Sequence, residues 1–222
     1  MEIALRHQPV STVARCSLGA TERILVEAGA VVAHTPSIGF DMVAEGSWRR
    51  AWRRSIRGNI SQPAWAVAGA SGGWLDIVAE GHGDVIHLDV TAEEGWLVNR
   101  SAWLASDATV EIDSNWSGVR AAVGGDGVRL VQCTGSGGVL LGAHGLAEGM
   151  VLDPGETVIV DSSIVLAFAN TVRYERRRAL AGRSLHELRT GEGFTFQFWG
   201  PGVVLLSTRQ LGRNADDSEP AR

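Results

Sequence analysis

One short pattern occurs three times in the chain, and it constrains the fold more than any other feature. In each copy an apolar run meets an acidic or amide residue, then continues through a small residue into a second apolar run that reaches an alanine. The copies cover residues 24–33, 96–105 and 158–167. A glycine-rich turn and a further apolar run follow each copy, starting at Ala70, Gly135 and Gly200. Two elements that recur in the same order about 65 residues apart are too widely spaced for an ordinary solenoid, and they predict a small β unit used three times.

The residue composition favours the same conclusion. Glycine accounts for 28 of the 222 residues and proline for only 6. Glycines interspersed with valine, isoleucine and tryptophan are typical of short strands joined by tight turns. We therefore predict an all-β fold, with three related β-sandwich units in one chain and one or two short helices. The expected organisation is a single compact domain over residues 1–209, with units near residues 21–81, 94–145 and 154–208, and a disordered tail over residues 210–222.

The charge pattern disfavours some classes of partner and location. The formal net charge is −5, which argues against a general nucleic-acid coat, and all 20 basic residues are arginine. Arg6, Arg15 and Arg23 interrupt any apolar stretch near the N-terminus, so we expect no signal peptide. No run approaches the roughly 18 apolar residues of a membrane span. The expected location is therefore the cytoplasm, either free or peripheral to a membrane. Cys16 and Cys133 lack a metal-ligand spacing and are interpreted as buried core thiols.

Most of the remaining pattern indicates strands. We expect strands at Val13–Cys16, Phe194–Trp199 and Val203–Ser207. The run from Leu25 to Ala33 is apolar nearly throughout, so it is predicted to be one buried strand. Gly29 in its middle indicates a bulge or a close approach of another backbone.

Two arginine-rich segments stand out from this pattern. In the first, Trp48, Trp52 and Ile56 recur at helical spacing, which predicts a short amphipathic helix. Its other faces carry Arg49, Arg50, Arg53, Arg54 and Arg57. A second basic helix is predicted over residues 176–189, and the arginine cluster around it comprises Arg173, Arg176, Arg177, Arg178 and Arg183. Anionic lipid attracts such arginines by about 1 kcal/mol each, and tryptophans suit the membrane interface. The alternative is that the tryptophans cover an open end of the sandwich while the arginines face water.

The glycine-rich turns are interpreted as turn geometry rather than as ligand sites. We assign this structural role to Gly135, Gly137, Gly200 and Gly202, because glycine accepts a positive φ angle. None of the turns is followed by Lys-Ser/Thr, which a phosphate-binding loop requires.

No catalytic or metal-binding set emerges from the sequence. His87 and Asp89 would share one face of a strand, but no further ligand converges on them, so the histidine is interpreted as a surface residue. Glu27, Asn99 and Asp161 occupy one position of the three copies. A polar position repeated in this way indicates a turn or backbone hydrogen-bonding device rather than three active sites. We therefore predict a protein with no enzymatic activity, no cofactor and no metal.

Several short motifs match a known family in their order and spacing. They are Glu27-Ala28-Gly29-Ala30, Gly83-Asp84-Val85-Ile86-His87-Leu88, Gly135-Ser136-Gly137, Ala143-His144-Gly145, Pro154-Gly155-Glu156 and Gly200-Pro201-Gly202. From about residue 13 to residue 209 the chain resembles the bacterial relatives of the altered-inheritance-of-mitochondria-twenty-four protein. The resemblance implies β-sandwich modules related to the tryptophan RNA-binding attenuation protein and assembled as homotrimers. It brings no established catalytic residues with it.

Three functions remain open at this stage. The first is a non-enzymatic oligomeric scaffold or adaptor, with a trimer favoured, that contacts an anionic membrane surface or a protein partner through its Arg- and Trp-rich segments. The second is an RNA-binding module, although nucleic acid is the less favoured partner because few aromatic residues accompany the arginines. The third is a cupin-like small-molecule or metal-binding protein, for which the sequence offers no ligand set.

Overall fold

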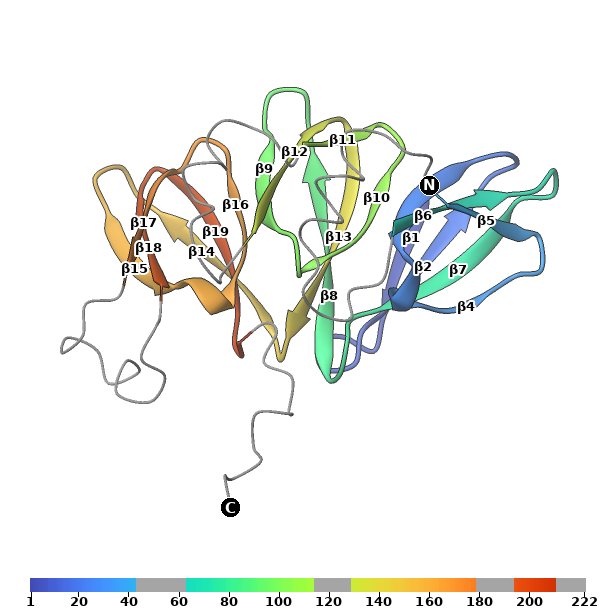
Figure 1. Cartoon of the computed structure of the whole chain (residues 1–222), viewed down its shortest axis with the longest axis horizontal. Helices are drawn as coiled ribbons and strands as arrows, with labels where there is room; N and C mark the ends of the chain where they lie inside the picture. Colours follow the sequence, from blue (N-terminus) through green and yellow to red (C-terminus); the bar gives the residue numbers. More distant parts are fainter. Residues whose placement is uncertain (43–62, 114–128, 179–193, 211–222) are drawn as a thin grey trace, which may run out of the picture.

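The computed structural model describes residues 1–42, 63–113, 129–178 and 194–210, and these residues are almost entirely β-structure. Figure 1 shows the strands in consecutive groups, from the N-terminal group at the right to the C-terminal group at the left. They are β1 (Glu2–Arg6), β2 (Val13–Leu18), β3 (Arg23–Glu27), β4 (Val31–His34), β5 (Ile38–Met42), β6 (Pro63–Ala68), β7 (Gly73–Val78), β8 (Gly83–Val90), β9 (Trp96–Asn99), β10 (Trp103–Asp107), β11 (Val110–Asp113), β12 (Leu130–Gly135), β13 (Gly137–His144), β14 (Ala147–Leu152), β15 (Thr157–Asp161), β16 (Val165–Ala169), β17 (Arg173–Arg178), β18 (Phe194–Trp199) and β19 (Gly202–Ser207). The predicted all-β class is confirmed.

These strands form four antiparallel sheets. The first sheet has the order β1-β2-β7-β4, the second β5-β6-β3-β10-β13-β8, the third β11-β12-β9-β16-β19-β14, and the fourth β15-β18-β17. The two six-stranded sheets are each joined in the middle by strands that are far apart in the sequence. β3 pairs with β10 in the second sheet, and β9 pairs with β16 in the third. We call these two pairings the junctions.

One arrangement of six strands recurs along the chain. We define the first unit as β2 to β7, the middle unit as β8 to β13 and the last unit as β14 to β19. Within each unit the sixth strand lies between the first and the third, as in β2-β7-β4. The fifth strand lies between the fourth and the second, as in β5-β6-β3. Each unit therefore contributes three strands to one sheet and three to the next. The leading strands β2, β8 and β14 precede the unit boundaries expected from the sequence.

The prediction of one continuous strand from Leu25 to Ala33 is wrong. The chain leaves β3 after Glu27, makes the 3-10 turn η1 (Ala28–Ala30) and enters β4, which belongs to a different sheet. The last unit repeats this route through η2 (Ser162–Ile164) between β15 and β16. Gly29 therefore lies in a turn and not in a bulge. The irregular pairing comes later, between Val31 and Ala33, and β10 and β16 have the same irregularity.

The predicted basic helix is also wrong where the structure describes it. Arg176, Arg177 and Arg178 belong to strand β17, which pairs with β18 along its whole length. The segment forms a strand because its side chains alternate between the two faces of the sheet. Tyr174 points inward and packs edge-on against Phe168, with 4.8 Å between the ring centroids. The remainder of that predicted helix, the helix predicted over residues 48–57 and the predicted tail lie outside the described residues, apart from residue 210.

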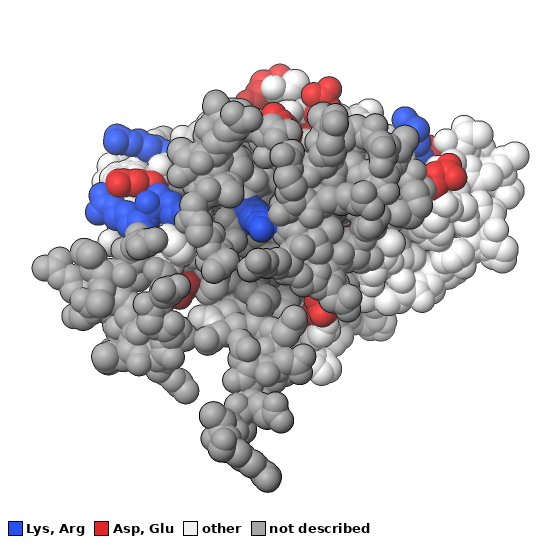
Figure 2. Space-filling view, in the orientation of Figure 1, with Lys and Arg blue, Asp and Glu red and all other residues white. Residues whose placement is uncertain are grey.

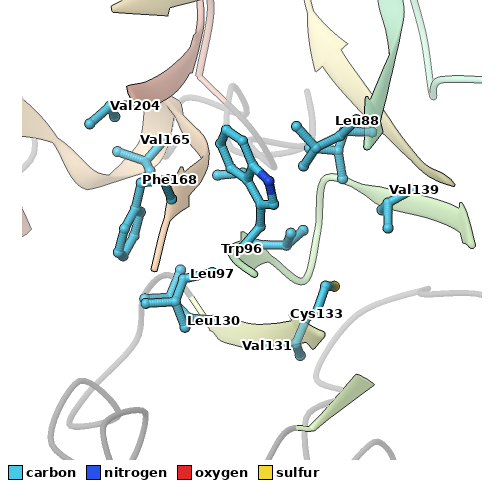
Figure 3. Packing of buried hydrophobic residues seen from close by; sticks show 14 of the residues in the cluster. Leu88, Trp96, Leu97, Leu130, Val131, Cys133, Val139, Val165, Phe168 and Val204 are labelled. Carbon is cyan, nitrogen blue, oxygen red and sulfur yellow. The ribbon is translucent and has the colours of Figure 1, made fainter. Parts of the chain in front are cut away.

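The main hydrophobic core lies on both sides of the third sheet. Trp96 occupies its centre, with Leu88 and Val139 on one side and Phe168 on the other (Figure 3). Trp103, Phe168, Phe196 and Phe198 are among the largest side chains that are fully buried. A second core cluster fills the space between the first and second sheets. Because each core is lined by strands from two units, burial of apolar surface stabilises the units together rather than one at a time.

Candidate functional site

The arginines of β17 form the described part of the predicted basic surface. Among the described strands β17 pairs with β18 alone, so it lies at the edge of the fourth sheet. Arg173, Glu175 and Arg177 are exposed on its outer side. The guanidinium of Arg173 lies 5.0 Å from the ring centroid of Trp199, and Nη2 of Arg177 donates a hydrogen bond of 2.9 Å to Glu175. Figure 2 shows these charges at the left end of the molecule, over the last unit. We call Arg173, Arg177 and Trp199 the basic strand surface.

The other predicted basic residues are placed differently. Arg176 is only partly exposed, because its guanidinium stacks 3.7 Å from the ring centroid of Phe194. Arg178 is the last residue of β17. The first predicted basic segment, with Trp48, Trp52, Arg49, Arg50, Arg53, Arg54 and Arg57, lies outside the described residues. The structure therefore brings Arg177 together with Arg173, and it separates them from Arg176 by the thickness of one sheet.

Within the described residues, the position of Arg173 carries an arginine in the last unit alone, and the positions equivalent to Arg177 in β5 and β11 lie outside the described residues. The strands equivalent to β17 in the other units are β5 and β11, which also lie at sheet edges. At the position of Arg173 they carry Gly39 and Glu111, and at the position of Glu175 they carry Asp41 and Asp113. The described outer faces of β5 and β11 are thus acidic, whereas that of β17 carries two arginines and one glutamate.

The polar position at the end of β3, β9 and β15 is a hydrogen-bonding device in two of its three copies, as predicted. Asn99 Oδ1 accepts hydrogen bonds from the backbone N–H and the hydroxyl of Ser101, at 3.2 and 2.9 Å. Asp161 Oδ1 accepts the same pair from Ser163, at 2.9 and 2.7 Å. Asn99 also donates from Nδ2 to the carbonyl of Val165 at 2.9 Å, across the junction between the middle and last units.

Glu27, which occupies this position in the first unit, has a different environment. No side-chain cap is formed there, and Gly29 stands where the other copies have serine. Burial raises the pKa of Glu27 to about 7, a rise that the neighbouring charge of Arg100 opposes and that of Glu80 increases. Arg100 is 5% exposed, and burial lowers its pKa to about 10. Arg100 was not predicted from the sequence, although it directly follows the buried strand β9, and a charged residue at such a place is a signal.

A second charged cluster that the sequence analysis missed lies on the first sheet. Arg15 donates from Nε and Nη2 to the two carboxylate oxygens of Asp76, each at 2.8 Å, and Arg6 donates to the same carboxylate at 2.9 Å. The hydrogen bonds from Arg15 hold the pKa of Asp76 below its usual range. The guanidinium of Arg15 also stacks 3.7 Å from the ring centroid of Trp74. Both carboxylate oxygens of Asp76 accept hydrogen bonds from arginine, so we assign the cluster a structural role.

The glycine-rich turns have the geometry of tight structural turns. Gly135, Gly137 and Gly202 have positive φ angles of 102°, 153° and 146°. A Cβ atom at Gly135 would meet the carbonyl oxygen of Thr109, and one at Gly200 would meet the carbonyl oxygen of Asp153. Only glycine fits such backbone positions without strain.

The histidine and cysteine side chains show no catalytic arrangement in the described ranges. His87 is exposed, with Nε2 3.7 Å from Asp89 Oδ1. Across these ranges no group of three or more His, Cys, Asp or Glu residues is placed to hold a metal ion. Cys16 and Cys133 are free and buried, and burial raises the pKa of each thiol to about 12. No helix in the described residues is long and apolar enough to cross a membrane.

Comparison with known proteins identifies the family. The chain is similar in fold to a Streptococcus pyogenes protein solved by the Northeast Structural Genomics Consortium, with a TM-score of 0.71 and 20% sequence identity, over 95% of this chain and 94% of that one. A comparison with curated proteins found no match. The family model described as mitochondrial biogenesis AIM24 matches residues 3–209. Because that match spans nearly the whole chain, the protein belongs to the AIM24 family.

Proposed function

We propose that this protein is a non-enzymatic oligomeric scaffold that presents the basic strand surface of its last unit to an anionic membrane surface. The observation that carries the proposal is the contrast between β17 and its equivalents: the exposed Arg173 stands where β5 carries Gly39 and β11 carries Glu111, and Arg177 adds a second exposed arginine to β17. Because the arginine stands in only one of three equivalent positions, the contact is directed to one end of each chain.

The geometry suits contact with lipid headgroups. Arg173 and Arg177 lie two pleats apart on one side of a strand, so both guanidinium groups face the same way. Each arginine near an anionic bilayer contributes about 1 kcal/mol of attraction. Trp199, beside Arg173, supplies an aromatic ring of the kind that favours the headgroup region. Two arginines alone bind weakly, so an oligomer that presents several copies strengthens the contact through multivalency.

Co-sedimentation with vesicles tests the membrane part of the proposal. The native protein is expected to pellet with phosphatidylcholine vesicles that contain phosphatidylserine, to remain in solution with phosphatidylcholine alone, and to be released by high salt. The Arg173→Glu, Arg177→Glu variant is expected to lose most of the bound fraction. A matched control is Arg23→Glu, Arg209→Glu, which changes the net charge equally at exposed positions away from β17. Equal loss in both variants would mean that overall charge, not the basic strand surface, determines binding.

Light scattering after size exclusion tests the oligomeric part. The chain has a mass of 23.6 kDa, and the favoured trimer predicts a particle of three times that mass. A monomeric mass at all concentrations would contradict this part of the proposal and leave the vesicle assay as an independent result.

RNA binding is a second candidate function, and the stacked pair of Arg173 and Trp199 is the observation that favours it. Arginines beside aromatic rings can stack on the bases of single-stranded RNA. Fluorescence anisotropy with a labelled single-stranded RNA distinguishes the two candidates. Tight binding that is lost on Trp199→Ala, with no binding to anionic vesicles, would favour RNA over the membrane.

A further inference from the structure

Strand β4 in the first unit and strand β15 in the last unit each have one edge that is unpaired among the described residues. β10 pairs with β13 and β3, and β16 pairs with β19 and β9, but β4, their equivalent in the first unit, pairs with β7 alone. In the same way β3 and β9 each have two partners, whereas β15 pairs with β18 alone. The first unit thus lacks the neighbour that precedes the other units, and the last unit lacks the neighbour that follows them.

The apolar side chains of β15 show the consequence. Leu25, Leu97 and Ile159 stand two residues before the polar residue that ends β3, β9 and β15. Leu25 is 7% exposed and Leu97 is 2% exposed, because each lies at a junction. Ile159 is 67% exposed. A large aliphatic residue that is buried in two copies and exposed in the third marks a surface from which the covering strand is missing.

β4 shows the complementary defect. Its residue Val32 is 59% exposed, whereas the equivalent Leu104 and Leu166 are 5% and 0% exposed. Ala33 is exposed as well, whereas the equivalent Ala105 in β10 is fully buried. An apolar edge of this kind invites pairing with a strand of matching shape. In the other units the equivalent edge is covered by the second strand of the preceding unit: β3 covers β10, and β9 covers β16.

We propose that β15 of one copy pairs antiparallel with β4 of a second copy, reproducing the two junctions inside the chain as a seam between chains. The junctions also give the register. Val26 lies opposite Ala105 and Val98 opposite Ala167, so Val160 lies opposite Ala33 of the second copy. One residue further, Leu25 lies opposite Ser106 and Leu97 opposite Phe168, which puts Ile159 opposite His34. The seam rests on the oligomeric part of the proposed function and specifies its interface.

The seam is a head-to-tail contact. β15 lies at the left end and β4 at the right end of Figure 1, so one copy cannot join its own two edges. Pairing between different surfaces of identical chains produces a ring when the rotation closes and a filament when it does not. A closed ring leaves neither β4 nor β15 unpaired.

Charge insertion at the seam is the first test. Ile159→Arg replaces a side chain that is already exposed within one copy, so the fold of the single chain is retained and the particle mass is expected to fall to that of a monomer. The matched control is Val151→Arg, on β14, which is 70% exposed and lies outside the seam. This control is expected to retain the native particle mass. Circular dichroism of both variants verifies that each remains folded.

Disulfide trapping tests the register. The His34→Cys, Ile159→Cys variant is expected to form covalently linked chains under mild oxidation, because directly opposed residues have Cβ atoms about 4.5–5.5 Å apart. Cys16 and Cys133 are buried and contribute little background. The control is His34→Cys, Thr157→Cys, in which the second thiol lies two residues along β15, and it is expected to link several-fold more slowly.

The outcomes separate the seam from the oligomeric proposal. An oligomer that persists in Ile159→Arg and is not trapped by the cysteine pair would overturn the seam while leaving oligomerisation intact. A wild-type chain that is monomeric throughout would overturn both. Faster trapping in the Thr157→Cys control would overturn the register.

Discussion

Glu27 is a partly buried carboxyl group whose protonation is coupled to folding. Its pKa is about 7 in the folded chain, above the ordinary value of 4.5, so the folded state holds the proton more tightly than the unfolded state. A raised carboxyl pKa means that stability is fully present below pH 4.5 and is lost as the pH rises toward 7. Arg100 limits the loss, because its charge favours the ionised carboxylate.

The Glu27→Gln variant removes this titration. The free energy of unfolding of the wild type is expected to fall by about 2 to 3 kcal/mol more than that of the variant between pH 4.5 and pH 7.5. Urea denaturation at a series of pH values measures both curves. Parallel curves over this range would show that Glu27 does not titrate there.

Gly135 is a residue whose replacement acts through the backbone. Alanine at this position would take a φ angle of 102° and bring its Cβ against the carbonyl of Thr109. Gly135→Ala is expected to destabilise the fold by about 1 to 3 kcal/mol, measured as a shift of the denaturation midpoint. Gly39→Ala is the control, since nothing lies within 4 Å of its added Cβ. A similar small effect in both variants would contradict the turn assignment.

At the scale of elements, the ends of β9 and β15 can be compared directly. Asn99 makes two hydrogen bonds within its turn and one across a junction, whereas among the described residues Asp161 makes the two within its turn and none across a junction. Asn99 is also 3% exposed, so its loss leaves buried polar groups unpaired. Asn99→Ala is expected to cost about 2 to 3 kcal/mol and Asp161→Ala about 1 kcal/mol, as measured by thermal unfolding. The reverse order would mean that the junction bond adds little.

The elements also show what could be predicted from the sequence. β18 was predicted within its observed bounds, because Phe196 and Phe198 alternate with Thr195 and Gln197. The break at η1 was missed, because an apolar run shows no period that separates one strand from two. The arginines of β17 suit a helix face and a strand edge equally well, and Tyr174 decides between them only through its contact with Phe168. For the candidate site, Arg173 and Arg177 were predicted as members of one basic cluster, but the stacking of Arg173 on Trp199 depends on strand pairing that no local pattern encodes.

At the scale of the whole molecule, the junctions make the three units interdependent. β3 and β10 come from different units yet lie in one sheet, and so do β9 and β16. Which strands meet in this way is set by tertiary packing, so the sequence predicted three units but not the exchange between them. A unit cut from the chain would leave apolar strand edges bare.

This arrangement predicts cooperative unfolding. Urea denaturation is expected to show one transition, coincident by far-ultraviolet circular dichroism and by tryptophan fluorescence. A fragment restricted to residues 82–145 is expected to be largely unfolded on its own. Separate transitions, or a folded fragment, would show that the units are independent domains.

The junctions also mean that, during synthesis, a strand is made well before the strand with which it pairs. β3 ends at Glu27, but its partner β10 starts only at Trp103. At about 5 to 20 residues per second, a ribosome needs roughly 4 to 15 seconds to make the intervening chain. Throughout that interval the edge of β3 is exposed on a nascent polypeptide. Translation speed and chaperone capture over this segment therefore influence how much of the newly made chain reaches the native sheet.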